Sequence, residues 1–178
     1  MRNDIKDVLI DEKTLKKRVS ELGKELAEEY KDKNPLVICV LKGSVLFMSD
    51  LVQSMDIPLE IDFMAISSYG SGTRSSGEVR ILKDLDKSVE GRDLLIIEDI
   101  VDSGLTLSYL IRIFKDRNTN SIKVCSLLDK PERRTSEVEI DYVGFVVPDE
   151  FVVGYGLDFA ERYRNLPFIG VLKEEVYA

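Results

Sequence analysis

The sequence predicts an α/β fold built on a mostly parallel, doubly wound sheet. Short apolar runs of the kind that form buried strands alternate with amphipathic helical stretches along the chain. The total of 178 residues matches the size of one domain. This alternation is typical of strands joined by right-handed helical crossovers. We therefore expect residues 1–178 to form a single domain.

The first half of the chain predicts a helix, a strand and a second helix. The apolar residues of the first helix recur every three or four positions, at Leu15, Val19, Leu22, Leu26 and Tyr30, and "KDKNP" ends it. The apolar run "PLVICVLKGS" is then a strand that stops at a Lys-Gly-Ser loop, and "VLFMSDLVQSM" keeps helical spacing. These elements form one strand-loop-helix unit.

The second half continues the alternation and then changes character. "LEIDFMAISSY" alternates as a strand and leads into the polar "GSGTRSSGEVR", whose composition favours a disordered hairpin tip over a mobile lid. "DLLIIED" and "IKVCSLLDK" are buried strands, with "LTLSYLIRIFKDR" as a helix between them. After "KPERRTSEVEID" come the short strands "YVGFVV", "FVVGYGLD" and "FIGVLK", which we expect to form an elaboration at the sheet edge that closes a cleft.

Composition excludes several classes of function. The net charge is −8, which disfavours a nucleic-acid partner. No apolar run approaches the roughly 20 residues that span a membrane, and the N-terminus lacks the apolar core of a secretory signal, so we expect a cytoplasmic protein. Cys39 and Cys125 stand in apolar runs and are predicted to be buried, reduced thiols.

The chain contains no histidine, which limits its chemistry. Ser-His-Asp and Cys-His catalysis are excluded, and so are the usual His-ligated zinc sites. A general base must be a carboxylate, Lys, Tyr or Cys. A metal ion should be a hard cation held by oxygen ligands.

The stretch "IIEDIVDSG" carries the strongest chemical signal. Glu98 and Asp99 end an apolar strand, and Asp102 follows within the loop, so three carboxylates stand close together and require compensation. The loop "DSGLT" places hydroxyls and a glycine just before a helix, which suits a bound phosphate. The spacing of a Walker loop is missing. A phosphate at 103–106 leaves Glu98 and Asp99 facing vicinal sugar hydroxyls or magnesium-bound water, as a ribose 5-phosphate would require.

"LLIIEDIVDSGLT" resembles the phosphoribosyl pyrophosphate signature of type I phosphoribosyltransferases. The segments "VLKGSVLFMSDL", "SSYGSG", "SLLDKPERR" and "PDEFVVGYGLDFAERYRNLPFIGVL" are similar, in order and spacing, to hypoxanthine-guanine phosphoribosyltransferases. Together they cover nearly all of residues 35–172. The resemblance implies the type I fold with a small hood of N- and C-terminal segments over the cleft. It also implies purine salvage, which yields IMP or GMP from hypoxanthine or guanine, with Mg²⁺ and in a homodimer or homotetramer.

The resemblance implies roles for the residues that bind phosphoribosyl pyrophosphate. Glu98 and Asp99 hold the ribose hydroxyls and magnesium, and Asp102 exchanges a proton with a purine ring nitrogen. The phosphate and pyrophosphate are bound by Leu41, Lys42, Gly43, Ser103, Gly104, Leu105, Thr106 and Arg164. Leu105 stands where some family members have Lys. The family typically has a cis peptide between the residues that match Leu41 and Lys42, and such a bond persists only where the surrounding structure enforces it.

The resemblance also implies a purine site and a lid. Lys130 donates to the purine 6-oxo group, Phe151 stacks on the ring, and the Val152 backbone contacts its edge. Asp158 borders the purine and completes a second magnesium site. Ser68 and Tyr69 belong to a mobile lid that excludes water, which replaces the hairpin-tip interpretation. Plainer interpretations are a surface ammonium for Lys42, a core ring for Phe151 and a solvated guanidinium for Arg164.

Three alternatives stay open at this point. A regulator of nucleotide synthesis could bind phosphoribosyl pyrophosphate without catalysis, although one that grips nucleic acid should have a basic face. A phosphoacceptor signalling domain would also combine an acidic pair with a distal lysine, but it should carry the pair on its first strand. Finally, an enzyme of the same family could prefer xanthine, which differs from the other two bases only at the purine 2-position.

Overall fold

The computed structural model describes residues 1–68 and 79–178. Its centre is a six-stranded sheet in the order β4-β3-β2-β5-β6-β7. Neighbouring strands run parallel, except that β4 is antiparallel to β3. The strands are β2 (Leu36–Leu41), β3 (Glu60–Ser68), β4 (Val79–Lys83), β5 (Asp93–Val101), β6 (Ser121–Asp129) and β7 (Tyr142–Val146). The predicted mostly parallel α/β sheet is confirmed.

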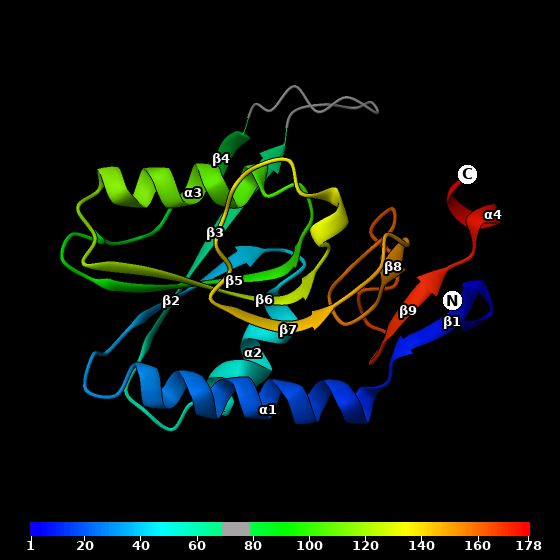
Figure 1. Cartoon of the computed structure of the whole chain (residues 1–178), viewed down its shortest axis with the longest axis horizontal. Coiled ribbons are helices and arrows are strands. Elements are labelled where there is room, and N and C mark those ends of the chain that lie inside the picture. Colours follow the sequence, from blue (N-terminus) through cyan, green and yellow to red (C-terminus); the bar gives the residue numbers. More distant parts are fainter. Residues whose placement is uncertain (69–78) are drawn as a thin grey trace.

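Helices cover both faces of this sheet (Figure 1). In that view α1 (Glu12–Glu29) and α2 (Val45–Gln53) lie below the sheet, and α3 (Leu105–Asp116) lies above it. Successive residues of β2 point to opposite faces, so Val37 packs in the core beside α1 and α2, whereas Ile38 packs in the core beneath α3. None of these helices in the described ranges has the length and apolar character needed to cross a membrane.

A second, smaller sheet forms the predicted hood from both ends of the chain. Its three antiparallel strands have the order β1-β9-β8, where β1 is Ile5–Ile10, β8 is Val152–Val153 and β9 is Ile169–Leu172. The 3-10 helix η1 (Arg2–Asp4) precedes β1, and α4 (Glu174–Tyr177) follows β9. Figure 1 shows the arrowheads of β5, β6 and β7 pointing toward this hood. The hood therefore stands beyond the carboxyl ends of the parallel strands.

Three strands differ from the sequence prediction. β7 pairs in parallel with β6, so "YVGFVV" extends the main sheet and is not part of the elaboration. β1 and β4 were not predicted as strands. Both are edge strands with exposed residues, and they therefore lack the continuous apolar run that marks a buried strand.

The two cysteines lie in the core, as predicted. Cys39 and Cys125 are both free and buried. Burial raises the pKa of Cys125 to about 12, and it also raises the pKa of Cys39. A thiol with a raised pKa stays protonated and is a poor nucleophile. The cysteines therefore contribute to packing rather than to chemistry.

Candidate active site

The residues predicted for the site gather at the carboxyl edge of the main sheet. β2, β5 and β6 are parallel neighbours, so their last residues meet at one edge. A hollow of about 230 Å³ opens there. It is lined by Glu98, Asp99, Ile100, Val101, Asp102, Ser103, Gly104, Thr106 and Leu107. The acidic pair and the predicted phosphate loop thus share one cavity.

Glu98 and Asp99 are a buried and a partly buried acid without a salt-bridge partner among the described residues. Glu98 is 7% exposed, and in the described part of the chain neither carboxylate forms a salt bridge. Burial, and next the charge of Asp99, raise the pKa of Glu98 well above its usual value. Burial also raises the pKa of Asp99, although the Ile100 N–H donates to Asp99 Oδ1 at 2.8 Å and opposes the shift. Ionising both carboxyl groups is therefore unfavourable in the free protein. A bound cation, or hydrogen-bond donors of a ligand, would stabilise the ionised forms.

The loop before α3 has the geometry of a phosphate site. Gly104 precedes the helix with φ +82°, a conformation that favours glycine. The first N–H groups of a helix have no intrahelical acceptor, and residues Gly104, Thr106 and Leu107 at this helix start line the 230 Å³ hollow. The Ser103 carbonyl is fixed by the N–H groups of Thr135 and Ser136, at 3.0 and 3.1 Å. Leu105 and Thr106 begin the helix, and Ser103 Oγ accepts from the Leu105 N–H at 3.3 Å.

Asp102 lies at the rim of this hollow beside an arginine that the sequence analysis did not single out. Arg133 Nε is 3.0 Å from Asp102 Oδ1. The N–H does not point at that oxygen, so the buried Oδ1 has a cationic neighbour but no hydrogen-bond donor. Arg134 Nε donates to the Asp102 carbonyl at 3.2 Å. The motif "KPERR" was the available signal, but it does not say which arginine meets the acid.

Lys130 is held at the next strand end along the sheet. It is 7% exposed, and its Nζ donates to the Glu150 carbonyl at 2.6 Å. Asp149 Oδ1 lies 3.8 Å from the same nitrogen. The Lys130 N–H donates to the Val101 carbonyl at 3.0 Å, which ties this lysine to the end of β5. The ammonium is therefore fixed beside Phe151 and close to the acidic loop.

An aromatic cluster surrounds the residue predicted to stack on the purine. Phe151 is 36% exposed and makes an edge contact with Phe159 at a centroid distance of 5.6 Å. Tyr177 of α4 stacks on Phe151 at 4.7 Å with an interplanar angle of 23°. Val152 is buried in β8. Phe151 is thus half-exposed and not the core ring of the plainer interpretation; Phe159 and Tyr177 were not predicted at the site.

The predicted pyrophosphate loop is clamped between the acids and the hood. The peptide between Leu41 and Lys42 is cis, as the resemblance implied. A side chain at Gly43 would place its Cβ 1.6 Å from Asp99 Oδ2. On the other side, Gly156 has φ +104°, and a Cβ there would lie 2.0 Å from the Gly43 carbonyl oxygen. Glycine is therefore required at Gly156, whereas a side chain at Gly43 would displace the Asp99 carboxylate.

Charged side chains form a chain of ion pairs above this loop. Lys42 Nζ lies 3.1 Å from Glu161 Oε2. Arg164 Nη1 lies 3.1 Å from Asp158 Oδ1 and donates to the Gly156 carbonyl at 2.8 Å. Arg164 Nη2 lies 3.3 Å from Glu161 Oε1, so the guanidinium is partly buried and ion-paired rather than solvated, whereas Lys42 is a largely exposed ammonium with one ion pair. The charges of Arg164 and Asp158 both act on the pKa of Asp99, which places this network beside the acidic pair.

The two residues predicted for the lid have different outcomes. Ser68 is the last residue of β3, whose backbone pairs with Val79 of β4. Tyr69 lies outside the described residues. The lid stays a prediction.

The donors fit a magnesium ion that is carried by a substrate rather than one caged by protein. Within residues 1–68 and 79–178, no group of three or more Asp, Glu, Cys or His side chains is placed to hold a metal. Mg²⁺ commonly uses one or two carboxylates together with substrate phosphates and water. Glu98 and Asp99 supply such a pair, with the excess negative charge that a cation would neutralise. Asp158 is already ion-paired with Arg164.

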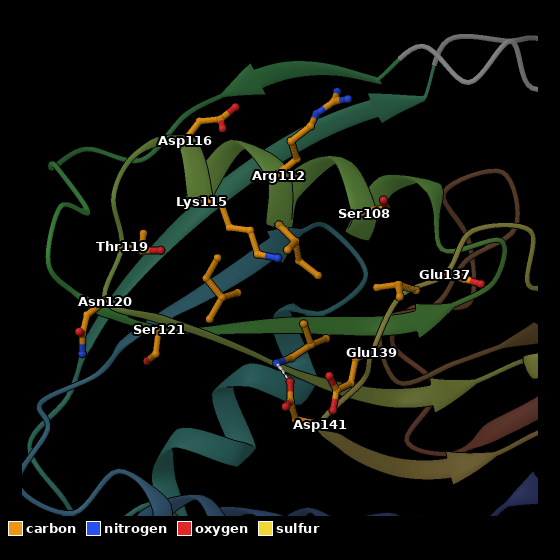
Figure 2. A pocket seen from close by; sticks show the side chains of 14 residues that line it. Ser108, Arg112, Lys115, Asp116, Thr119, Asn120, Ser121, Glu137, Glu139 and Asp141 are labelled. Carbon is orange, nitrogen blue, oxygen red and sulfur yellow. Dashed lines mark hydrogen bonds between the residues drawn. The ribbon is translucent and has the colours of Figure 1, made fainter.

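A larger hollow lies elsewhere and contains none of the predicted site residues. It measures about 680 Å³ and lies between α3 and residues 137–141 (Figure 2). Its polar lining mixes both charges: Arg112 and Lys115 come from α3, and Glu137, Glu139 and Asp141 from the segment after the 3-10 helix η2 (Pro131–Arg133), with Lys115 pointing into the hollow in Figure 2. Asp141 already accepts from the Val124 N–H at 2.8 Å. Size alone therefore does not identify the site, because the buried unpaired acids lie around the smaller hollow.

Comparison with known proteins points to the same chemistry as the geometry. The family model for the phosphoribosyl transferase domain matches residues 7–160. The chain is 63% identical over 177 residues to the hypoxanthine-guanine phosphoribosyltransferase of Bacillus subtilis, which covers 99% of this chain and 98% of that protein. It is 62% identical over 178 residues to the bifunctional protein TilS/HprT of Listeria monocytogenes, and it spans 28% of the length of that relative.

Solved structures show the same similarity. A crystal structure of a hypoxanthine phosphoribosyltransferase from Staphylococcus aureus superposes with a TM-score of 0.97 at 51% sequence identity. The match covers 100% of this chain and 97% of the other. The fold described above is therefore the fold of that enzyme.

Proposed function

The chain belongs to the phosphoribosyl transferase family, and from this membership we propose that it is a purine salvage enzyme. It transfers the 5-phosphoribosyl group of phosphoribosyl pyrophosphate to hypoxanthine or guanine and releases IMP or GMP with pyrophosphate. One observation carries the proposal. The hollow before α3 and the buried ammonium of Lys130 lie at one edge of the sheet.

The reaction exchanges one bond at the anomeric carbon of the ribose. The bond to the pyrophosphate oxygen breaks, and a bond to a purine ring nitrogen forms. The α3 amino end, Ser103 and Thr106 bind the 5-phosphate, and Glu98 and Asp99 accept hydrogen bonds from the ribose hydroxyls. Asp102 takes up the proton that the purine loses. Lys42 and Arg164 bind the leaving pyrophosphate.

Magnesium fits this scheme as part of the substrate complex. Glu98 and Asp99 would hold the ion, with Asp158 as the proposed contact on the hood side. When bound, the ion neutralises charge on the leaving group. The raised pKa of Glu98 supports this role, because an acid that resists ionisation in the free protein becomes an acceptable carboxylate once a cation is near.

Lys130 accounts for the choice of base. An ammonium can donate hydrogen bonds but cannot accept them, so it matches a 6-oxo group and rejects the 6-amino group of adenine. The hydrogen bond from Lys130 to the Glu150 carbonyl aims the side chain and supports this assignment. Phe151 stacks on the base, and the Val152 backbone contacts its edge. Rejection of adenine follows from Lys130, whereas the ranking of hypoxanthine, guanine and xanthine is left to experiment.

The remaining features of the proposal concern the whole protein. Residues 1–178 act as one phosphoribosyltransferase domain, in which the hood closes one side of the cleft. Ser68 and Tyr69 belong to the lid that covers the reacting carbon. A homodimer or homotetramer in the cytoplasm stays a prediction.

The decisive test is a spectrophotometric assay with magnesium and phosphoribosyl pyrophosphate. Hypoxanthine, guanine, xanthine and adenine are supplied separately. We expect nucleotide from the 6-oxopurines and none from adenine. Tight binding of phosphoribosyl pyrophosphate without turnover of any base would instead indicate a regulator.

Lys130→Ala tests the account of base choice in the same assay. We expect discrimination against adenine to fall by about tenfold or more, because a buried donor that penalises the 6-amino group is lost. Lys123→Ala is the control, since it removes a lysine from the opposite, amino end of β6, where it pairs with Glu29. Unchanged discrimination in Lys130→Ala would show that another group selects the base.

A further inference from the structure

Glu161 occupies the space between the two cations assigned to pyrophosphate. Its Oε2 lies 3.1 Å from Lys42 Nζ, and its Oε1 lies 3.3 Å from Arg164 Nη2. Each carboxylate oxygen therefore contacts a different cation. Arg164 Nε, in contrast, is buried without a hydrogen-bond partner in the described residues, so this guanidinium still has a donor to offer.

The hood loop is built to hold Glu161 in this position. Ala160, Glu161 and Tyr163 all have positive φ, at 50°, 63° and 78°. Such conformations are unfavourable for residues other than glycine and persist only where surrounding contacts enforce them. The Glu161 N–H donates to Asp158 Oδ2 at 2.9 Å, and Tyr163 Oη donates to Asp4 Oδ2 at 3.0 Å. The bridge between the cations is therefore part of an ordered loop.

The carboxylate of Glu161 is an anion across the working range of pH. The hydrogen bond from Lys42 lowers its pKa, and the charge of Lys42 acts in the same direction. Both partners are largely exposed, with side chains 66% and 65% accessible for Lys42 and Glu161. Exposed pairs of this kind contribute little free energy and exchange readily. A doubly charged ligand can therefore replace Glu161 at a small cost.

We propose that Glu161 is the internal counter-anion of the pyrophosphate subsite, which competes with pyrophosphate for Lys42 and Arg164. It keeps the two cations close together in the free protein and leaves them when the ligand enters. Glu161 thereby weakens the binding of pyrophosphate and favours its release. This inference rests on the proposed function, which assigns the two cations to pyrophosphate.

The test compares the binding of magnesium pyrophosphate to the full chain and to Glu161→Gln by isothermal titration. Glutamine keeps the length of the side chain and removes its charge. We expect the dissociation constant to fall by about threefold to tenfold, since the exposed pair with Lys42 and the partly buried pair with Arg164 no longer compete with the ligand. The KM for hypoxanthine should stay unchanged. A dissociation constant that is unchanged or higher would overturn the inference.

Two further variants separate this competition from other effects. Glu28→Gln removes the same charge from an exposed position on α1, so equal tightening there would mean that only the net charge of the protein matters. Lys42→Gln combined with Glu161→Gln tests the partner, because the effect of Glu161→Gln should shrink once Lys42 is gone. If the parent protein itself fails to bind pyrophosphate or phosphoribosyl pyrophosphate, the proposed function fails first.

Discussion

The carboxylates at the two ends of β5 differ in their hydrogen-bond and ion-pair partners. At the amino end, Asp93 Oδ1 accepts hydrogen bonds from Asn120 Nδ2 at 2.7 Å and Ser121 Oγ at 2.5 Å. At the carboxyl end, buried Glu98 and partly buried Asp99 are adjacent, and within the described residues neither forms a salt bridge. One strand therefore carries an acid with side-chain hydrogen-bond donors at one end and two acids without a cationic partner at the other.

The same contrast extends to the neighbouring elements. Near the amino end, Glu60 pairs with Arg92 at 3.1 Å, and Arg117 donates two hydrogen bonds to Asp84. These contacts stabilise the folded chain. The acids at the carboxyl end lower its stability until a ligand compensates them. The contrast teaches that unfavourable charge marks the functional end of this sheet more clearly than cavity size does.

The largest effect should come from Asp102, the acid nearest the proposed purine. Asp102→Ala should lower turnover by about a hundredfold or more, because proton transfer to a positioned acid or base is worth that much. Binding of phosphoribosyl pyrophosphate should stay largely intact, as equilibrium titration would show. Asp93→Ala removes an acid from the amino end, and its folded form should turn over like the parent. Equal losses in both variants would contradict the contrast.

A smaller effect is expected from closing the space between the hood and the pyrophosphate loop. Gly156→Ala should raise the KM for phosphoribosyl pyrophosphate by about tenfold, because its Cβ would meet the Gly43 carbonyl at 2.0 Å and its φ is +104°. Gly91 also has a positive φ, +71°, but no atom lies within 4 Å of its Cβ position. Gly91→Ala should therefore cost some thermal stability and leave this KM unchanged. A normal KM in Gly156→Ala would mean that the hood does not position the loop.

Much of this contrast was predictable from local sequence. Buried strands such as β5 are continuous apolar runs, so the sheet and its carboxyl edge follow from the pattern. Glu98 and Asp99 stand directly at the end of such a run. The turn before α3 is likewise local, since Gly104 and the hydroxyls lie within a few residues of the helix start.

The contacts that the sequence did not predict join distant segments. Arg133 meets Asp102, Glu161 meets Lys42, and Tyr177 stacks on Phe151 only because the hood and the strand ends come together in the fold. No periodic pattern encodes such pairs. The edge strands β1 and β4 were not predicted for a different reason. About half of their residues are exposed, so these strands lack a continuous apolar run. Local sequence patterns predict helices and strands, whereas contacts between distant residues depend on how the whole chain packs.

The stability of the acidic end provides a third test. Burial raises the pKa of Glu98, so the folded state holds a proton there more tightly than the unfolded state does. The contribution of Glu98 is therefore favourable at low pH and is lost as pH rises through the raised value. Glu98→Gln cannot ionise and should be more stable than the parent at pH 8, by roughly 1 kcal/mol in chemical denaturation.

The matched variant at the amino end should behave in the opposite way. Glu60→Gln breaks the pair with Arg92 and should lower stability by a few tenths of a kcal/mol, about the value of an exposed pair. Magnesium with phosphoribosyl pyrophosphate should raise the melting temperature of Glu60→Gln as much as that of the parent, and that of Glu98→Gln much less. Destabilisation of the protein by Glu98→Gln would show that its carboxylate is compensated after all.

The smallest effect is expected from the pair of Asp84 and Arg117. Their two hydrogen bonds, at 2.8 and 2.6 Å, lower the pKa of Asp84. A lowered pKa contributes stability above the unfolded value, and this is lost as pH falls through the folded value. The side chains of Arg117 and Asp84 are 35% and 44% exposed, so solvent screens the pair. Asp84→Asn should therefore lower the free energy of unfolding by only about 0.5 kcal/mol at pH 7. Chemical denaturation should show that the difference in stability between Asp84→Asn and the parent is smaller at pH 3 than at pH 7. Asp116→Asn, on the exposed end of α3, should leave the stability unchanged at both pH values.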